Sequence, residues 1–182
     1  MTSWEVSAAT RDAIRGAIRE IPDYPKPGIT FKDITPLLGN GTLFADTCAL
    51  LALPFLDAGI SHVLAVESRG FLFGGPVAVA LGAGLVPVRK PGKLPHATAS
   101  ETYTLEYGTD ALEVHLDALG QRSRVLIVDD VLATGGTAAA AARLVRRLRA
   151  EVVGSSFVIE LAALDGRRAL TDQRIECAIV YR

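Results

Sequence analysis

The fold is decided by one stretch of the sequence, Arg124-Val-Leu-Ile-Val-Asp-Asp-Val-Leu-Ala-Thr-Gly-Gly-Thr137. Residues 125–128 are an apolar run, β-branched at three of four positions and flanked by charge, which predicts a strand buried on both faces of a parallel sheet. Asp129 and Asp130 follow where that strand is predicted to end. This is the edge at which open α/β sheets bind their ligands.

A glycine pair, Gly135 and Gly136, comes next and precedes an alanine-rich segment that favours a helix. Glycines ahead of a helix start let free backbone N–H groups approach a ligand, and the helix dipole adds partial positive charge there. The loop Ala133-Thr-Gly-Gly-Thr137 is therefore predicted to hold a phosphate. Thr134 and Thr137 offer hydroxyl donors.

The acid pair narrows the kind of phosphate ligand, because two carboxylates repel a dianion unless they accept hydrogen bonds or face a cation. A sugar phosphate satisfies both parts, with its phosphate on the loop and its ribose hydroxyls on Asp129 and Asp130. The stretch is not a Walker A loop and lacks the G-x-G-x-x-G dinucleotide pattern. The plain alternative is an ordinary turn and helix cap beside two solvated acids.

The bulk composition indicates one soluble globular domain spanning residues 1–182, with 49% hydrophobic and 21% charged residues. A net charge of −1 argues against nucleic-acid or anionic-membrane partners, and no apolar run is long enough to span a bilayer. Residues 1–20 contain no signal-peptide core, so a cytoplasmic protein is expected. Cys48 and Cys177 are predicted to be reduced core thiols, and the histidines lack metal-ligand spacing.

Periodicity along the chain alternates between strand and helix patterns, which predicts an α/β fold with a mainly parallel central sheet flanked by helices. Helices are predicted over residues 3–20, 42–58, 71–81 and 138–150, with Thr42 as a cap and a kink or break at Pro54. Strands are predicted over residues 63–66, 85–88, 112–116, 125–128, 157–161 and 175–181. A turn or short helix is expected near residues 165–170, and polar residues 98–104 are assigned to a loop.

Cationic side chains follow two of these strands and should lie at the same sheet edge as the phosphate loop. Arg69 presents a planar fork suited to phosphate oxygens, although it could instead pair with Glu67 or cap a carbonyl. Arg89, Lys90 and Lys93 belong to a Pro/Gly-containing loop that could face a polyanion or could be solvated surface. Arginines 143, 146, 147 and 149 are interpreted as a solvated helix face, not a nucleic-acid patch.

The central stretch resembles the motif with which type I phosphoribosyltransferases bind 5-phosphoribosyl 1-pyrophosphate (PRPP). Nearly the whole chain resembles the adenine phosphoribosyltransferase family within that group. Four further motifs carry this resemblance: Pro27-Gly-Ile-Thr-Phe-Lys-Asp33, Glu67-Ser-Arg-Gly-Phe-Leu-Phe73, Val88-Arg-Lys-Pro-Gly-Lys-Leu-Pro95 and Tyr103-Thr-Leu-Glu-Tyr-Gly108. Their order and spacing are those of the family. Lys32 is a departure, since some relatives carry Arg there and a lysine lacks the planar fork.

The resemblance implies a role for each motif. Asp129 and Asp130 would contact the ribose, and Glu106 would be the catalytic acid near the base, with Tyr107 beside it. The pyrophosphate would be bound by Glu67, Ser68, Arg69, Arg89, Lys90 and Lys93, with a cis peptide preceding Ser68. Adenine would be bound by Ile29, Thr30, Phe31, Lys32 and Leu161, although from the residues alone Phe31 could equally be a core side chain.

The implied architecture adds a small N-terminal hood over residues 22–38 and a mobile loop over residues 91–104. The implied reaction converts adenine and PRPP to AMP and pyrophosphate, with Mg²⁺ bound through PRPP and no direct protein ligand. The implied assembly is a homodimer. Two alternatives stay open: a phosphoribosyltransferase for a 6-oxopurine such as hypoxanthine or guanine, and a non-catalytic module that senses PRPP or a nucleotide.

Overall fold

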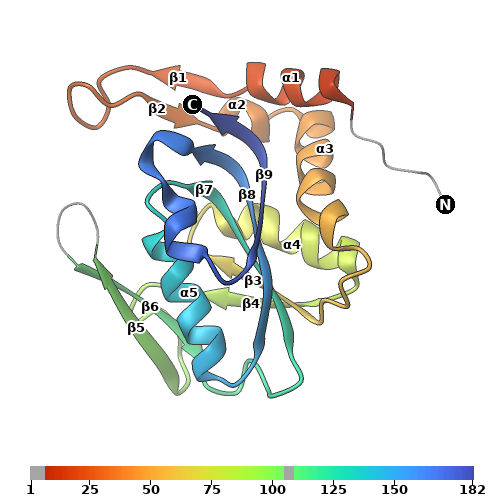
Figure 1. The fold of residues 1–182 in the computed structure, drawn as a ribbon, viewed down its shortest axis with the longest axis vertical. Helices are drawn as coiled ribbons and strands as arrows, with labels where there is room; N and C mark the ends of the chain where they lie inside the picture. Colours follow the sequence, from red (N-terminus) through yellow and green to blue (C-terminus); the bar gives the residue numbers. More distant parts are fainter. Residues whose placement is uncertain (1–6, 105–108) are drawn as a thin grey trace. The chain divides into compact units, whose positions relative to one another are not determined.

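The computed structural model describes residues 7–104 and 109–182 of the chain, which divides into two compact units, Met1–Leu50 and Leu51–Arg182. Figure 1 shows both units. No helix in the described residues is long and apolar enough to cross a membrane.

The first unit contains short helices and a two-stranded antiparallel sheet. Its elements are α1 (Ala8–Gly16), β1 (Arg19–Ile21), β2 (Phe31–Asp33), α2 (Thr35–Leu38) and α3 (Gly41–Ala52), the last of which continues past Leu50. The prediction of a helix up to residue 20 is wrong at its end, because the chain forms β1 and pairs with β2 from Arg19 onward.

The start of α3 also differs from its prediction. The side chain of Asn40, not that of Thr42, accepts a hydrogen bond from the N–H of Leu43 at 3.1 Å, so Asn40 takes the capping role. The predicted break at Pro54 is confirmed. The α-helix ends at Ala52 and a 3₁₀ turn, η1 (Leu53–Phe55), follows.

The second unit is built on a five-stranded parallel sheet with the order β4-β3-β7-β8-β9 (Figure 1). The strands are β3 (His62–Val66), β4 (Gly84–Val88), β7 (Arg124–Leu132), β8 (Glu151–Leu161) and β9 (Arg174–Tyr181). The predicted α/β fold with a mainly parallel sheet is therefore confirmed. Two 3₁₀ turns, η2 (Ala162–Leu164) and η3 (Gly166–Leu170), connect β8 to β9, as expected near residues 165–170.

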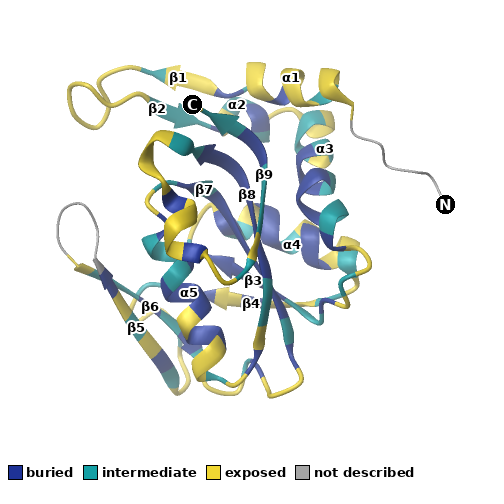
Figure 2. Cartoon of the chain, in the orientation of Figure 1, coloured by how far each residue is buried: buried dark blue, intermediate teal, exposed yellow. Residues whose placement is uncertain are grey.

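Helices α4 (Gly70–Leu81) and α5 (Gly136–Arg147) make the crossovers β3–α4–β4 and β7–α5–β8. The two crossovers move in opposite directions along the sheet, so right-handed connections place the helices on opposite faces. Strands β7 and β8 are mostly buried, whereas β4 at the sheet edge is partly exposed (Figure 2). Residues 125–128 are fully buried, as the opening motif predicted.

An antiparallel ribbon lies outside the central sheet and consists of β5 (Thr98–Thr104) and β6 (Thr109–His115). The assignment of residues 98–104 to a loop is wrong. Their apolar members, Ala99 and Tyr103, are small or polar-tipped and give a weak strand signal, yet both are buried in one core cluster with Leu144 and Val145 of α5. Residues 98–104 therefore form a strand because they pair with β6, although their own sequence does not predict one.

Two arginines of α5 fasten this helix to the ribbon. Arg143 Nε donates to Glu101 Oε1 at 2.5 Å, and Arg147 Nη1 donates to the carbonyl oxygen of Ser100 at 2.9 Å. The interpretation of the helix arginines as a merely solvated face is therefore incomplete, because tertiary pairing with β5 uses two of them.

Candidate active site

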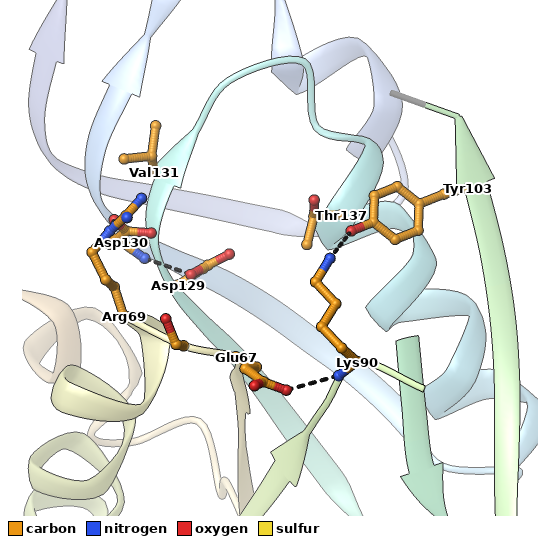
Figure 3. A pocket seen from close by; sticks show the side chains of 9 residues that line it. Glu67, Arg69, Lys90, Tyr103, Asp129, Asp130, Val131 and Thr137 are labelled. Atoms are coloured by element: carbon orange, nitrogen blue, oxygen red, sulfur yellow. Dashed lines mark hydrogen bonds and ion pairs between the residues drawn. The ribbon is translucent and has the colours of Figure 1, made fainter. Parts of the chain in front are cut away.

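A cavity of about 280 Å³ opens at the carboxyl ends of β3 and β7 (Figure 3). Its walls come from four separate stretches of the second unit. The lining residues are Glu67, Ser68, Arg69, Lys90, Tyr103, Asp129, Asp130, Val131 and Thr137. Seven of these nine belong to the predicted site, and Tyr103 and Val131 are additions.

The acid pair lies inside a strand and not after it, because β7 continues to Leu132. Asp129 and Asp130 are only 9% and 6% exposed, which rules out the alternative of two solvated acids. Burial, and next the charge of Asp130, raise the pKa of the Asp129 carboxyl well above its usual value. The N–H of Asp130 donates to Asp129 Oδ1 at 2.8 Å and opposes part of that rise.

Arg69 provides the countercharge for the second acid. Its Nε donates to Asp130 Oδ2 from the loop between β3 and α4. The guanidinium also lines the cavity, where its positive charge attracts an anion. The anticipated alternative, in which Arg69 pairs with Glu67, is wrong: Glu67 accepts from Arg89 Nη2 at 3.3 Å and from the Lys90 N–H at 2.8 Å.

The Glu67 contacts hold the start of the loop that follows β4, where Arg89 and Lys90 lie. The Lys90 N–H is the main cause of a lowered Glu67 pKa, with Arg89 also contributing against the opposing effect of burial. The peptide between Glu67 and Ser68 is cis, as the resemblance implied. Gly70 begins α4 directly below Asp129. A Cβ there would lie 2.9 Å from Asp129 Oδ1, so only glycine permits this close approach.

The predicted phosphate loop connects β7 to α5 with Gly135 in a left-handed conformation, φ +80°. At the N-terminus of α5, the Ala139 N–H donates to the Gly135 carbonyl oxygen at 2.9 Å. Helix geometry therefore leaves the N–H groups of residues 136–138 available to an anion. A Cβ at Gly135 would lie 2.3 Å from the Gly166 carbonyl oxygen, so η3 packs directly against the loop.

Lys90 brings in two ribbon residues. Its ammonium donates to Tyr103 Oη at 3.1 Å and to Asp110 Oδ2. The hydrogen bond of Tyr103 Oη to Asp110 Oδ2, at 3.2 Å, closes the group. Tyr103 belongs to one of the motifs that carry the resemblance, which implies no role for it. The sequence analysis did not identify Asp110. Their relation to Lys90 depends on the β5–β6 register, in which Tyr103 faces Asp110.

Several predicted site residues lie elsewhere. Lys93 is exposed and outside the cavity lining, and Leu161 ends β8 at the same sheet edge. The predicted adenine segment, residues 29–32, belongs to the first unit. There Phe31 packs edge-on against Tyr24 with ring centroids 5.4 Å apart, and Lys32 pairs with Glu20. Glu106 and Tyr107 lie outside the described residues.

Of the two cysteines, Cys48 is buried as expected, and Cys177 is partly buried and packs against a core cluster. Burial raises the pKa of Cys48 to about 11 and that of Cys177 to about 12, so neither is a reactive thiolate at neutral pH. Both cysteines are free. Across residues 7–104 and 109–182, no group of three or more His, Cys, Asp or Glu side chains is placed to hold a metal ion.

Comparison with known proteins gives the family of the chain. The phosphoribosyl transferase domain family matches residues 48–180. The chain is 56% identical to the adenine phosphoribosyltransferase of Serratia proteamaculans over 90% of this chain and 83% of that one. The crystal structure of the Rhodothermus marinus adenine phosphoribosyltransferase is also similar, with a TM-score of 0.91 at 49% identity over 96% of this chain and all of the other.

A third similar structure is the Saccharomyces cerevisiae enzyme complexed with adenine and an imino-altritol bisphosphate. It has a TM-score of 0.90 at 40% identity, covering 94% of this chain and 99% of its own. The parallel sheet, the acid pair and the glycine loop define a protein of the type I phosphoribosyltransferase class. Within that class, the chain belongs to the adenine phosphoribosyltransferase family.

Proposed function

We propose that the chain transfers the 5-phosphoribosyl group of PRPP to adenine, forming AMP and pyrophosphate. One observation carries the proposal: a single cavity combines two buried carboxylates, a helix N-terminus and two cations. A ribose with a phosphate on one end and a pyrophosphate on the other needs these three kinds of group. The adenine held by the similar Saccharomyces cerevisiae structure supports the choice of base.

The reaction breaks the bond between ribose C1 and pyrophosphate oxygen and forms a bond between C1 and adenine N9. Positive charge develops on the ribose as the pyrophosphate leaves, so a nearby carboxylate stabilises the transition state. Asp129 and Asp130 would accept hydrogen bonds from the ribose hydroxyls, while the loop Ala133–Thr137 would hold the 5′-phosphate. Arg69 and Lys90 would stabilise the charge on the leaving pyrophosphate, assisted by Arg89 and Lys93.

The proton of the attacking base must be removed as the new bond forms. We assign this role to Glu106, with Tyr107 beside it, and assign adenine binding to Ile29, Thr30, Phe31, Lys32 and Leu161. The phenyl ring of Phe31 supplies the flat apolar face that a purine needs for stacking.

Mg²⁺ would enter with PRPP and neutralise charge on its pyrophosphate. The residues present fit this mode of binding, since Mg²⁺ commonly keeps water and substrate phosphate oxygens as ligands and needs few protein carboxylates. Glu67, Asp129 and Asp130 are the carboxylates that line the cavity.

The test measures nucleotide formation by the purified protein with PRPP·Mg²⁺ and one of two bases, AMP from adenine or IMP from hypoxanthine. We expect AMP from adenine and at least about a hundredfold lower rate with hypoxanthine, because buried polar groups that match a 6-amino group are left unpaired by a 6-oxo group. A faster hypoxanthine reaction would point to a 6-oxopurine enzyme. Binding of PRPP without turnover of any purine would point to a sensing module.

We further propose a cytoplasmic homodimer that binds neither nucleic acid nor membrane. Support for the dimer comes from exposed apolar side chains of the second unit: Leu72 and Val79 of α4 and Leu85 of the edge strand β4 are 44%, 83% and 49% exposed. Burial of such side chains against a second subunit would stabilise a dimer. Light scattering of wild type and Val79→Glu tests it: only the variant should be monomeric.

A further inference from the structure

Lys90 is the cavity cation whose position depends most on the ribbon. Its ammonium is held by Tyr103 and Asp110, which face each other across the β5–β6 pair. The ammonium also lies 5.6 Å from the centre of the Tyr103 ring. Lys90 and Tyr103 line the cavity (Figure 3), whereas Asp110 is not among its lining residues.

We propose that Asp110 is a positioning residue for the pyrophosphate end of the substrate, because it holds the Lys90 ammonium at the cavity wall together with Tyr103. The inference rests on the proposed function and extends it to a residue with no contact to the substrate.

The number of hydrogen-bond donors supports this role. A lysine ammonium has three N–H donors, and Asp110 and Tyr103 together take two of them. The third donor is left for the cavity. A free lysine must be ordered when it binds an anion, whereas a lysine already held in place loses less side-chain entropy.

Asp110 is itself held firmly. Its Oδ1 accepts a hydrogen bond from the N–H of Ala111 at 2.8 Å, and its Oδ2 accepts hydrogen bonds from the Lys90 ammonium and the Tyr103 hydroxyl. Tyr103 is 6% exposed and packs in the core cluster that includes Leu112 and Leu144. The two groups that hold Lys90 are therefore anchored to the strand pair and to the core under α5.

Asp110 also keeps Lys90 charged. Burial lowers the pKa of Lys90, but the hydrogen bonds that its ammonium donates to Asp110 and Tyr103 more than offset this effect, so the pKa lies above its usual value. Burial raises the pKa of Asp110, and the contacts of Lys90 and the Ala111 N–H more than offset that rise. An anionic ligand thus meets a protonated lysine.

The alternative is that the Lys90–Asp110 pair only fastens the ribbon to the loop after β4. A second carboxylate of the ribbon allows a matched comparison. Glu101 on β5 also forms an ion pair, but with Arg143 of α5 and outside the cavity lining. Glu101→Gln removes an ion pair from the same ribbon without touching Lys90.

The experiment is calorimetric titration with two probes, inorganic pyrophosphate with Mg²⁺ and ribose 5-phosphate. The loss of a charge-assisted hydrogen bond in Asp110→Asn should weaken pyrophosphate binding about fivefold to tenfold and leave ribose 5-phosphate within about twofold. Tyr103→Phe keeps the ring and should weaken pyrophosphate binding about twofold to threefold. Glu101→Gln should bind both probes as the wild type does.

A double-mutant cycle isolates the action through Lys90. In a Lys90→Met background, Asp110→Asn should change pyrophosphate affinity by less than about twofold, because there is no ammonium left to hold. The proposal is overturned by unchanged or tighter pyrophosphate binding in Asp110→Asn, by the same loss without Lys90, or by an equal loss in Glu101→Gln.

Failure of this proposal is distinguishable from failure of the proposed function. A protein that shows the predicted pyrophosphate pattern but forms no AMP supports the role of Asp110 and refutes the transferase reaction. A protein that forms AMP while Asp110→Asn binds pyrophosphate normally refutes the role of Asp110 alone.

Discussion

The two walls of the cavity are built in different ways. One wall, called here the sheet wall, consists of Asp129, Asp130 and the loop Ala133–Thr137, and it comes from one continuous stretch of nine residues within residues 129–137. The other wall, called here the cationic wall, consists of Glu67, Arg69, Lys90 and Tyr103. Arg89 and Asp110 support it from outside the cavity lining through hydrogen bonds with Glu67 and Lys90. Its members come from the ends of two strands and from a ribbon outside the sheet.

The burial of the charged residues differs between the two walls in the same way. Asp129 and Asp130 are less than 10% exposed, whereas the side chains of Lys90 and Asp110 are 37% and 26% exposed. The sheet wall is held by backbone pairing and close packing, while the cationic wall is held by ion pairs that water can reach. A polyanion can compete for those ion pairs, so we expect ligand binding to change the cationic wall more.

The largest effect should come from removing both charges of the sheet wall. Asp129→Asn together with Asp130→Asn should reduce kcat by about 10³-fold or more, because carboxylates beside a developing cation in a water-poor site contribute several kcal/mol. The circular dichroism spectrum should stay that of the wild type. Wild-type turnover in the double variant would remove the acid pair from the mechanism.

The second test compares one glycine from each wall region. Gly135 and Gly92 have similar positive φ angles of +80° and +75°, but an added Cβ meets the Gly166 carbonyl at 2.3 Å in the first case and open space in the second. Both alanine variants carry about 1–2 kcal/mol of left-handed strain. Only Gly135→Ala adds a steric clash, about 1–3 kcal/mol more.

We therefore expect Gly92→Ala to lower Tm by a few degrees, at about 2–4 °C for each kcal/mol, and Gly135→Ala to lower it by clearly more. Gly135→Ala should also weaken ribose 5-phosphate binding, since the loop N–H groups shift. Thermal scans and calorimetry measure both. Equal Tm losses in the two variants would show that η3 does not confine the loop.

The third test concerns motion of the cationic wall. Residues 91–97, the part of the expected mobile loop 91–104 that lies outside β5, have no helix or strand. We predict that this segment closes over bound PRPP. Amide exchange should slow by about tenfold or more in residues 91–97 with PRPP·Mg²⁺, while β7 stays unchanged. Equal exchange with and without PRPP would leave this segment as an ordinary surface turn.

The smallest effect should be a gain in stability. The folded-state pKa of Asp129 is raised, so its stabilising contribution is full below the unfolded pKa of about 3.9 and is lost as pH rises through the folded value. Asp129→Asn should therefore raise the free energy of unfolding by about 1 kcal/mol at pH 8, which raises Tm by about 2–4 °C. The gain should be smaller at pH 5.

Asp130→Asn is the matched control for that measurement, because it removes the partner of Arg69 and should not stabilise the protein. Identical Tm shifts for the two variants at both pH values would contradict the assignment of an uncompensated charge to Asp129.

The sequence by itself determined the sheet wall. An apolar β-branched run, two acids, a glycine pair and a helix-favouring segment are consecutive, and each acts on its immediate neighbours. Local forces therefore specify a buried strand, its ligand-binding end and a helix N-terminus. In the structure the strand is longer than predicted and ends at Leu132, and the two acids are buried, not solvated.

Only the tertiary structure decided the cationic wall. The pairing of Arg69 with Asp130 joins residues 61 positions apart, and the contact of Lys90 with Asp110 depends on the register of two strands, one of which was not predicted. A charged side chain has many possible partners in a sequence, and the free energies of those pairings differ little on a hydrated surface. The choice among them is made by strand register and by packing on α5, which bring Tyr103 and Asp110 to Lys90.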